Sequence, residues 1–378
     1  MNRSNVATVT AVIPAYNAEK FLERTILSAA GQTHDDLKIL VVDDGSTDGT
    51  AELVKRLMHS LPQLSSIRTQ NRGVAAARNL GTELADSEYV AFLDSDDLWH
   101  PTKIAKQINA IQRHGSDSDW AACYTLFRRI DEQDFVVRTG SSYAARGAIF
   151  GSHLVNNHVG NGSSLLVKRD AAIEIGGFDP SYADRGIGGC EDLDFQLRLL
   201  RKYRLEVVPE FLVGYRYHSE SMSANHKRMG FGHVEVINKY LDDPTIGPTL
   251  HVMAKEAMNR FLFMKLLAAK DWKNSFLTLL KLLRLAPVQT LSRLNARINQ
   301  SLITTAKHSM WGILNVRDPD RRLFYDWQVS EGFVAEEKLP HSPVIRQLRR
   351  LDDQAARSRE QQNTDNSEFE IRNRNQAS

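Results

Sequence analysis

Short apolar runs alternate with amphipathic stretches from residue 8 to about residue 130. The apolar runs have the length of buried strands and are rich in β-branched residues; they cover residues 8–13, 37–43, 67–69 and 89–94. The other stretches repeat apolar residues at the spacing of a helix face, over residues 18–30, 51–60, 74–85 and 101–115. Strands that alternate with helices predict an α/β fold with a mostly parallel sheet flanked by helices.

The pattern changes twice further along the chain. Residues 121–218 mix strand-like and helical segments, which we expect to complete the sheet and its site. Beyond about residue 235 the pattern is helical, and the last residues are polar with few aliphatic side chains. The sequence thus predicts a catalytic α/β domain at 1–235, a helical C-terminal extension at 236–350 and a disordered tail at 351–378.

Composition and charge exclude several classes of protein. The formal net charge of the 378 residues is +2, so no global basic field indicates a nucleic-acid partner. Cys123 and Cys190 lie far apart and outside any CxxC pattern, which favours a reducing compartment. The sequence has neither a signal-peptide pattern nor 18 consecutive apolar residues. We therefore expect a cytoplasmic protein.

Acidic residues cluster where two predicted strands end. Asp43 and Asp44 follow the second strand, and Asp94, Asp96 and Asp97 follow the fourth. Sheets of this type bind ligands at the carboxyl ends of their strands. Asp94 and Asp96 could hold Mg²⁺ or Mn²⁺ together with substrate phosphates. The alternative is that Asp96 or Asp97 caps the helix predicted near Pro101.

Six motifs occur in order at strand ends and loops: VIPAYN, VVDDGSTDGT, NRGVAAARN, FLDSDD, GGFD and the Glu191-Asp192 pair. Together they resemble the family 2 glycosyltransferases over roughly residues 7–220. The resemblance implies the GT-A fold, a Rossmann-like α/β arrangement, and inverting transfer from a nucleotide-diphosphate sugar. It says little about the remainder of the chain.

The resemblance also implies roles for particular residues. It assigns the nucleotide to Pro14, Ala15, Tyr16, Asp44, Arg78, Asp94 and Ser95. Asp96 becomes the principal ligand of a divalent metal (Mn²⁺ or Mg²⁺), with His218 as a further ligand. Asp192 becomes the base that takes the acceptor proton, with Glu191 beside it in the acceptor pocket.

Each of these roles has a structural alternative. Acids in the first turn of a helix, such as Asp192, stabilise its dipole without any catalysis. Arg78 could lie on a helix surface with its stem packed on the sheet. A histidine that follows an apolar strand, as His218 does, is often structural. Cys190 departs from the family pattern, in which glycine or another small residue precedes the Glu-Asp pair.

The helical end of the chain is basic and amphipathic. From Lys255 to Lys307 there are ten Lys or Arg residues against two acids. Within residues 267–287, Trp272 and Phe276 share one face with several leucines, whereas lysines lie on the other. This face could pack on the catalytic domain, which we favour, or contact an anionic membrane surface peripherally, such as the inner face of the plasma membrane.

These features predict transfer of a sugar from a nucleotide-diphosphate donor to a hydroxyl of a glycan or lipid-linked acceptor in cell-surface glycan synthesis. The resemblance favours UDP over dTDP and GDP, because UDP is the commonest nucleotide among relatives, and loops at 140–165 are expected to select the sugar. A sugar nucleotidyltransferase fits less well, because IPAYNAEKFL contains no glycine to cradle a triphosphate. A non-catalytic nucleotide-sugar or glycan-binding protein is the other alternative. No GxGxxG opens the first helix, which excludes a dehydrogenase.

Overall fold

The structure is a computed structural model that describes residues 7–116, 118–140, 143–243, 246–292, 322–330, 347, 350–354 and 357. Within these ranges nine strands form one sheet, in the order β3-β2-β1-β4-β8-β6-β9-β5, with β7 paired to β6. The strands are β1 Val9–Ala15, β2 Leu37–Asp43, β3 Leu64–Arg68, β4 Tyr89–Phe92, β5 Leu98–Trp99, β6 Trp120–Ile130, β7 Val136–Thr139, β8 Leu165–Lys168 and β9 Arg204–Arg216.

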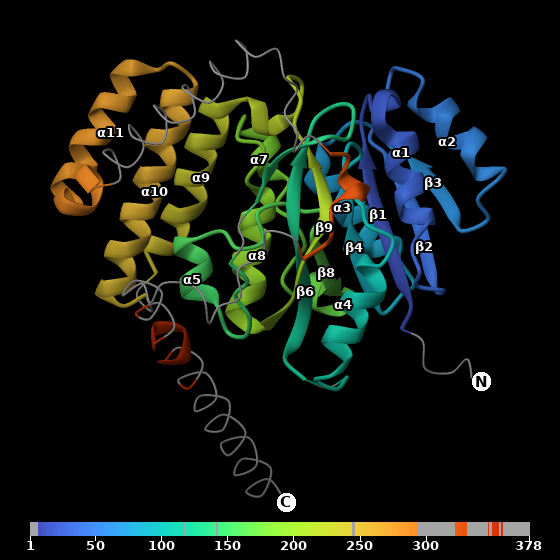
Figure 1. Cartoon of the computed structure of the whole chain (residues 1–378), viewed down its shortest axis with the longest axis horizontal. Coiled ribbons are helices and arrows are strands. Elements are labelled where there is room, and N and C mark those ends of the chain that lie inside the picture. Colours follow the sequence, from blue (N-terminus) through green and yellow to red (C-terminus); the bar gives the residue numbers. More distant parts are fainter. Residues whose placement is uncertain are drawn as a thin grey trace, which may run out of the picture.

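Helices cover both faces of the sheet and one end of the molecule (Figure 1). They are α1 Glu19–Ala30, α2 Thr50–Met58, α3 Val74–Leu84, α4 Lys103–Gln112, α5 Phe150–Val155, α6 Arg169–Glu174, α7 Ser181–Asp184, α8 Glu191–Lys202, α9 His226–Leu241, α10 Pro248–Ala268 and α11 Trp272–Leu285, with 3₁₀ turns η1 Met222–Ala224 and η2 Phe324–Asp326. The predicted alternation of strands and helices over the first 115 residues is confirmed, with shifts of one to three residues at most element ends.

The sheet is parallel in its first half and mixed in its second. β1 pairs in parallel with β2 and β4, and β2 with β3. β8 then lies antiparallel between β4 and β6, whereas β9 runs parallel to β6. The chain moves outward from β1 to β3 and returns to the other side of β1 at β4. The topological switch point therefore lies between the ends of β1 and β4, where such sheets bind ligands.

Two apolar layers hold the sheet between its helices. Along β1, Val9, Ala11 and Ile13 face the layer that contains α1, α2 and α4, whereas Val12 faces the opposite layer. This alternation is the two-residue period of a strand buried on both faces. Each fully buried aliphatic side chain stabilises the fold by about 1.5–3 kcal/mol. The packing fixes the strand ends from which the acidic residues project.

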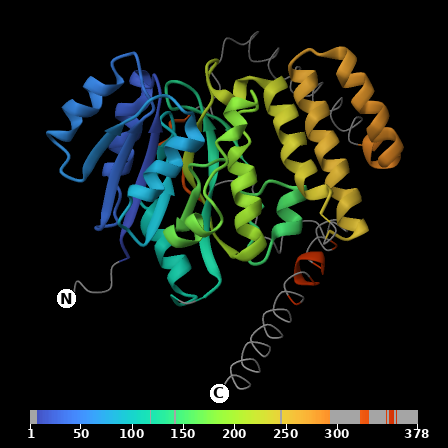
Figure 2. The ribbon, with the colours of Figure 1, turned by 180° about the vertical axis from the view of Figure 1, so that it is seen from behind.

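The C-terminal helices share the core of the α/β region. Val236 on α9 and Ala254 on α10 are completely buried in the same cluster as Phe195 of α8. The predicted boundary at residue 235 falls within helix α9. The division of the chain into a catalytic domain and a helical extension stays a prediction. Figure 2 shows α8, α9, α10 and α11 side by side, with α11 outermost.

Helix α11 packs on α10 through a different face from the one predicted. Ser275, Thr278 and Leu282 are buried, whereas Trp272 is 67% exposed and Phe276 is 61% exposed. The preferred sequence interpretation, a helical hairpin packed on the catalytic domain, agrees with the packing of α11 on α10, but the packed face is not the aromatic one. Small and hydroxylated side chains allow α11 to approach α10 closely, and the large apolar side chains point outward.

The remaining predictions about the chain are met in part. Both cysteines are buried and free. None of the helices in the described ranges combines the length and apolar character needed to cross a membrane. Of the predicted disordered tail, residues 351–354 are helical, and Asp352 accepts a hydrogen bond from Gly151 N at 2.7 Å. Most of that tail, and residues 293–321, lie outside the described residues.

Gly81 sets how closely α3 approaches β1. A Cβ atom at this position would lie 2.3 Å from Val12 Cγ1. Gly81→Ala should therefore strain the contact by about 1–3 kcal/mol, which exceeds the gain of about 1 kcal/mol in helix propensity. We expect a net loss on the order of 1 kcal/mol in the free energy of unfolding, measured by urea denaturation. The loss should shrink in a Val12→Ala background; an equal loss in both backgrounds would contradict this packing.

Candidate functional site

Two adjoining cavities lie at the carboxyl ends of β1, β2 and β4. The β1 cavity, of about 520 Å³, is lined by the ends of these strands and by residues that follow β9. The α8 cavity, of about 440 Å³, is lined by the start of α8, the loop 156–162 and helices α9 and α10. Five residues line both cavities: Asp94, Glu191, Tyr215, Met222 and Ser223. These shared residues form the wall between the two spaces.

The β1 cavity brings together most of the residues assigned to the nucleotide and the metal. Its lining includes Pro14, Ala15, Tyr16, Asp44, Asp94, Ser95, Asp96 and His218. Tyr16 is 51% exposed, so its ring is available to a ligand. Arg78 and Asp192 are not in this lining and face the α8 cavity instead.

Asp44 is buried and fixes the loop before α3. Its Oδ1 and Oδ2 accept hydrogen bonds from Arg72 N at 2.9 Å and from Gly73 N at 2.7 Å. Gly73 has a φ of 88°, which favours glycine at this position. A carboxylate offers about four acceptor positions, so Asp44 can also accept from a ligand.

The three carboxylates of the acidic turn after β4 contact three different partners. Asp94 Oδ1 accepts from Arg78 at 2.5 Å, Asp96 Oδ2 lies 3.0 Å from His218 Nε2, and Asp97 Oδ2 accepts from Ser163 Oγ at 2.6 Å. Burial, followed by the charge of Asp96, raises the pKa of the Asp97 carboxyl well above its ordinary value.

The helix-cap alternative for this turn is not realised. Helix α4 begins at Lys103 with Thr102 as its N-cap residue, and no side chain caps it. Asp97 instead accepts from the backbone N–H of Arg216 at 2.8 Å, so it ties the turn to β9. β5, which follows the turn, pairs antiparallel with β9. This pairing brings His218 next to Asp96, although the two residues are 122 positions apart in the sequence.

Asp96 and His218 are the residues that could hold a divalent cation. Among the described residues no group of three His, Cys, Asp or Glu side chains is arranged to hold a metal ion. The pair does place a carboxylate oxygen and a ring nitrogen 3.0 Å apart in the wall of the β1 cavity. Mg²⁺ is commonly bound by one or two carboxylates, waters and substrate phosphates, which suits this two-donor arrangement.

Arg78 joins the acidic turn to helix α8. Its guanidinium is 2% exposed, donates to Asp94 and lies 3.5 Å from Glu191 Oε1. Burial opposes the charge of this side chain, but Asp94 and Glu191 together raise the pKa of Arg78 above its ordinary value. The surface-helix alternative for Arg78 is therefore wrong, since the side chain lies in the interior between two carboxylates.

Glu191 is buried, and both of its carboxylate oxygens have partners within the protein. It is 4% exposed, and its Oε2 accepts from Gly189 N at 2.8 Å while Oε1 faces Arg78. The carboxylate lines both cavities, but its oxygens are directed toward partners within the protein. This geometry favours a role in positioning α8.

Asp192 stands apart from the other acids of the first turn of α8. Asp194 pairs with Arg198 at 2.9 Å, and Glu191 pairs with Arg78. The hydrogen bond found for the Asp192 carboxylate among the described residues comes from its neighbour Leu193 N, at 2.7 Å. Burial, followed by the charge of Glu191, raises the pKa of Asp192 to about 7. A carboxyl with this pKa can exchange a proton near neutral pH.

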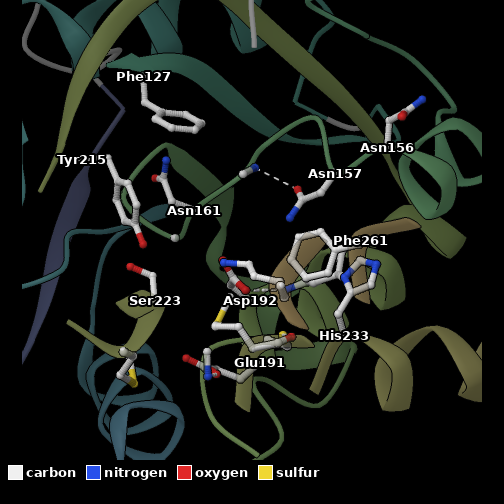
Figure 3. Close-up of a pocket in the computed structure, with 18 of the residues that line it drawn as sticks. Phe127, Asn156, Asn157, Asn161, Glu191, Asp192, Tyr215, Ser223, His233 and Phe261 are labelled. Atoms are coloured by element: carbon white, nitrogen blue, oxygen red, sulfur yellow. Dashed lines mark hydrogen bonds between the residues drawn. The ribbon is translucent and has the colours of Figure 1, made fainter. Parts of the chain in front are cut away.

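The rest of the α8 cavity comes from parts of the chain outside the six motifs. Figure 3 shows Asp192 and Glu191 with Tyr215 and Ser223 on one side and with Phe261 and His233 on the other. Asn156, Asn157 and Asn161 come from the 140–165 region that was expected to select the sugar. Basic residues Arg129, Arg260 and Lys265 complete the lining. The sequence showed that the segment of α10 is basic, but it did not show that Arg260 and Lys265 of this helix line the same cavity as Asp192.

The sequence matches the family model described as Glycosyl transferase family 2 over residues 10–176. Over 222 residues the chain is 30% identical to UDP-Glc:alpha-D-GlcNAc-diphosphoundecaprenol beta-1,3-glucosyltransferase WfaP of Escherichia coli, a match that covers 57% of this chain and 80% of that protein. An uncharacterized glycosyltransferase of Rickettsia bellii is 32% identical over 144 residues, 38% of this chain. The match spans 20% of the length of the Rickettsia protein.

Solved structures resemble the fold over most of this chain. The mannosyltransferase PcManGT from Pyrobaculum calidifontis, in complex with GDP-Man and Mn²⁺, gives a TM-score of 0.53 at 20% identity and covers 79% of this chain and 81% of that chain. TarS 1-349 of S. aureus, in complex with UDP-GlcNAc, gives a TM-score of 0.51 at 15% identity, covering 75% and 82% respectively. At these identities the likeness concerns the fold.

Replacing Asp192 with Asn should change how stability depends on pH. The Asp192 pKa is about 7 in the folded protein against an ordinary value of 3.8, so the folded state gains stability at low pH and loses it as pH rises through 7. Asn does not titrate. The free energy of unfolding of Asp192→Asn, relative to the original protein, should therefore rise between about pH 4 and pH 7, by about 4 kcal/mol, and then level off.

Urea unfolding at several pH values from 5 to 8.5 measures this difference. Asp184→Asn, at an exposed position on α7 outside both cavities, serves as the matched control. If the difference in free energy of unfolding between Asp192→Asn and the original protein did not vary with pH, that result would contradict the raised pKa of Asp192.

Proposed function

The chain belongs to glycosyl transferase family 2 and has the GT-A fold that its motifs predict, and we propose that it transfers a sugar from a nucleoside-diphosphate donor to an acceptor hydroxyl with inversion at the anomeric carbon. The observation that carries this proposal is the division of the site into two cavities. Asp96 and His218 line one, Asp192 lines the other, and Asp94 and Glu191 lie between them. Donor and acceptor thereby have separate spaces that meet at one wall.

The β1 cavity suits the nucleotide. Pro14, Ala15 and Tyr16 line one side with backbone and an exposed ring, and Asp44 supplies acceptor oxygens for a base N–H or ribose hydroxyls. Asp94 lines both cavities, and Ser95 follows it in the lining of the β1 cavity. A sugar whose diphosphate lies near Asp96 would then extend toward the shared wall.

Asp96 and His218 would hold the divalent cation at the diphosphate end of the β1 cavity. Such a cation supplies Lewis-acid stabilisation of the charge that develops on the leaving diphosphate. Asp94 is already paired with Arg78, so its charge is partly neutralised and it can lie near an anionic substrate. Asp97 is buried against Ser163 and shapes the turn.

Asp192 is the proposed general base. As the acceptor oxygen attacks the anomeric carbon, its proton passes to the Asp192 carboxylate and the bond from that carbon to the diphosphate oxygen breaks. Attack from the face opposite the leaving group gives inversion. A pKa of about 7 leaves roughly half of the Asp192 carboxyls ionised at neutral pH and gives the base enough basicity to accept the proton.

UDP is the proposed nucleotide, because the WfaP relative is named for a UDP-Glc donor. The same name describes a lipid-linked diphosphate acceptor, which supports a role in the synthesis of a cell-surface glycan. The family match argues against the nucleotidyltransferase alternative. The experiment below distinguishes the enzyme from the remaining alternative, a non-catalytic binding protein.

Two variants should separate binding from transfer. Asp192→Asn should bind UDP as the original protein does but lower transfer by about 10²–10⁴-fold, because a general base contributes this much. Asp96→Ala should weaken UDP binding by about tenfold or more with Mn²⁺ present and leave it unchanged with EDTA. Calorimetric titration with UDP, dTDP and GDP, each with Mn²⁺ and with EDTA, measures binding, and release of nucleoside diphosphate measures turnover.

Asp86→Asn provides the control, because Asp86 is an exposed partner of Lys38 outside both cavities. Near-full turnover by Asp192→Asn would exclude Asp192 as the base. Absence of metal-dependent binding of every nucleotide, by a folded protein, would point to the non-catalytic alternative.

We further propose that α11 contacts an anionic membrane surface. Trp272, Phe276 and Leu280 recur every four residues and are 67%, 61% and 39% exposed. They form an apolar stripe on the outermost helix, and Lys273 and Lys281 lie next to it in the sequence and are also exposed. An apolar stripe flanked by lysines suits the interface of an anionic bilayer. Such contact would keep the site near a lipid-linked acceptor.

Vesicle sedimentation tests this contact. The protein should bind vesicles that contain phosphatidylglycerol more strongly than vesicles of phosphatidylcholine alone, and the double variant Trp272→Ala/Phe276→Ala should lose most of that binding. Leu84→Ala, at an exposed apolar position on α3, should not change it. Equal sedimentation with both kinds of vesicle, or full binding by the double variant, would contradict the proposal.

A further inference from the structure

Besides Arg78, which is paired with Asp94 and Glu191, three further basic side chains line the α8 cavity from outside helix α8. Arg129 comes from β6, and Arg260 and Lys265 come from α10. They therefore lie in the same cavity as Asp192 but on different walls. None of the three lies in one of the six motifs.

The local protein supplies little negative charge to this cluster. Among the described residues no carboxylate forms an ion pair with Arg129 or Lys265, whereas Arg260 lies 3.6 Å from Glu256 on its own helix. Of the three acids that line the cavity, Asp94 and Glu191 both pair with Arg78, and Asp192 is the proposed base. Burial, followed by the charge of Arg129, lowers the pKa of Lys265. An anion in the cavity would relieve this repulsion.

Neutral groups in the cavity are suited to a sugar. The rings of His233 and Phe261 lie 4.2 Å apart, and Phe127 and Tyr215 lie 5.7 Å apart, so flat apolar surfaces are present (Figure 3). Asn161 is 3% exposed, and its Nδ2 has no hydrogen-bond partner among the described residues. A buried donor of this kind is costly unless a ligand oxygen accepts from it. The cavity thus combines ring surfaces, a free amide donor and cations.

We propose that the acceptor is anionic, and that Arg129 and Lys265, together with Arg260, bind its charge while its hydroxyl lies at Asp192. This inference rests on the proposed function and adds the chemical class of the acceptor. The charge could be a carboxylate on an acceptor sugar or the phosphate of a glycosyl phosphate, because both present oxygens that guanidinium and ammonium groups bind. The donor diphosphate has its own partners in the β1 cavity, which leaves these cations for the second substrate.

Calorimetric binding to the protein loaded with UDP and Mn²⁺ tests this class directly. The probes are p-nitrophenyl β-D-glucuronide against p-nitrophenyl β-D-glucoside, and N-acetylglucosamine 1-phosphate against N-acetylglucosamine. At least one anionic probe should bind about tenfold more tightly than its neutral counterpart. The pair that shows the preference identifies the source of the charge, carboxylate or phosphate.

The double variant Arg129→Gln/Lys265→Gln should reduce that preference to within about twofold, because two charge-assisted contacts are lost. Lys255→Gln, on the exposed side of the same helix α10, is the matched control and should keep it. Binding of UDP is measured on each protein first, so a failure of the proposed function is seen as loss of UDP binding, independently of the acceptor probes.

Three results would overturn the inference. The first is the absence of any anionic preference, including no binding of any probe. The second is a preference that survives in the double variant. The third is a charge preference confined to the donor, seen as tighter binding of UDP-glucuronic acid than of UDP-glucose that the double variant abolishes.

Discussion

A buried guanidinium holds the two halves of this site together. Arg78 extends from α3 and binds Asp94 at the end of β4 and Glu191 at the start of α8. Removing one partner of a buried ion pair costs about 3–5 kcal/mol, because the remaining charge is left without compensation. The network therefore fixes α8 relative to the acidic turn, and with it the separation of Asp192 from Asp96. The wall between the cavities depends on this contact.

The helices that follow the α/β region belong to the site as well as to the core. α9 and α10 bury Val236 and Ala254 against the same cluster as α8, and they also supply His233, Phe261 and Lys265 to the α8 cavity. Substitutions in these helices can therefore alter the cavity without touching the family motifs. More than half of the residues that line the α8 cavity lie beyond the stretch that matches the family model.

Local patterns predicted much of the first half of the fold. The strand at 37–43 is β2 to the residue, because an uninterrupted apolar run between turns leaves little choice of boundary. The carboxylates after β2 and β4 lie at one edge of the sheet, as parallel pairing requires. The antiparallel insertion of β8 was not predicted, because pairing partners depend on contacts between distant segments.

The side-chain environments of the site were less accessible to sequence reasoning. Nothing in AAARN indicates that Arg78 is buried between two acids from other elements, and nothing in FLDSDD separates the buried Asp97 from the cavity residue Asp96. Likewise, the aromatic face of α11 has the period of a packed helix but is exposed, because Ser275 and Thr278 allow a closer approach to α10. Each outcome depends on tertiary packing that a local period does not specify.

A crystal structure of the protein with UDP and Mn²⁺, with anomalous diffraction data at the manganese edge, would test whether the site divides into a donor side and an acceptor side. We expect one manganese peak between Asp96, His218 and the diphosphate, with the uracil beside Tyr16 and Asp44 and with the α8 cavity free of nucleotide. A nucleotide bound in the α8 cavity, or a manganese ion on Asp192, would contradict the division of the site into a donor side and an acceptor side.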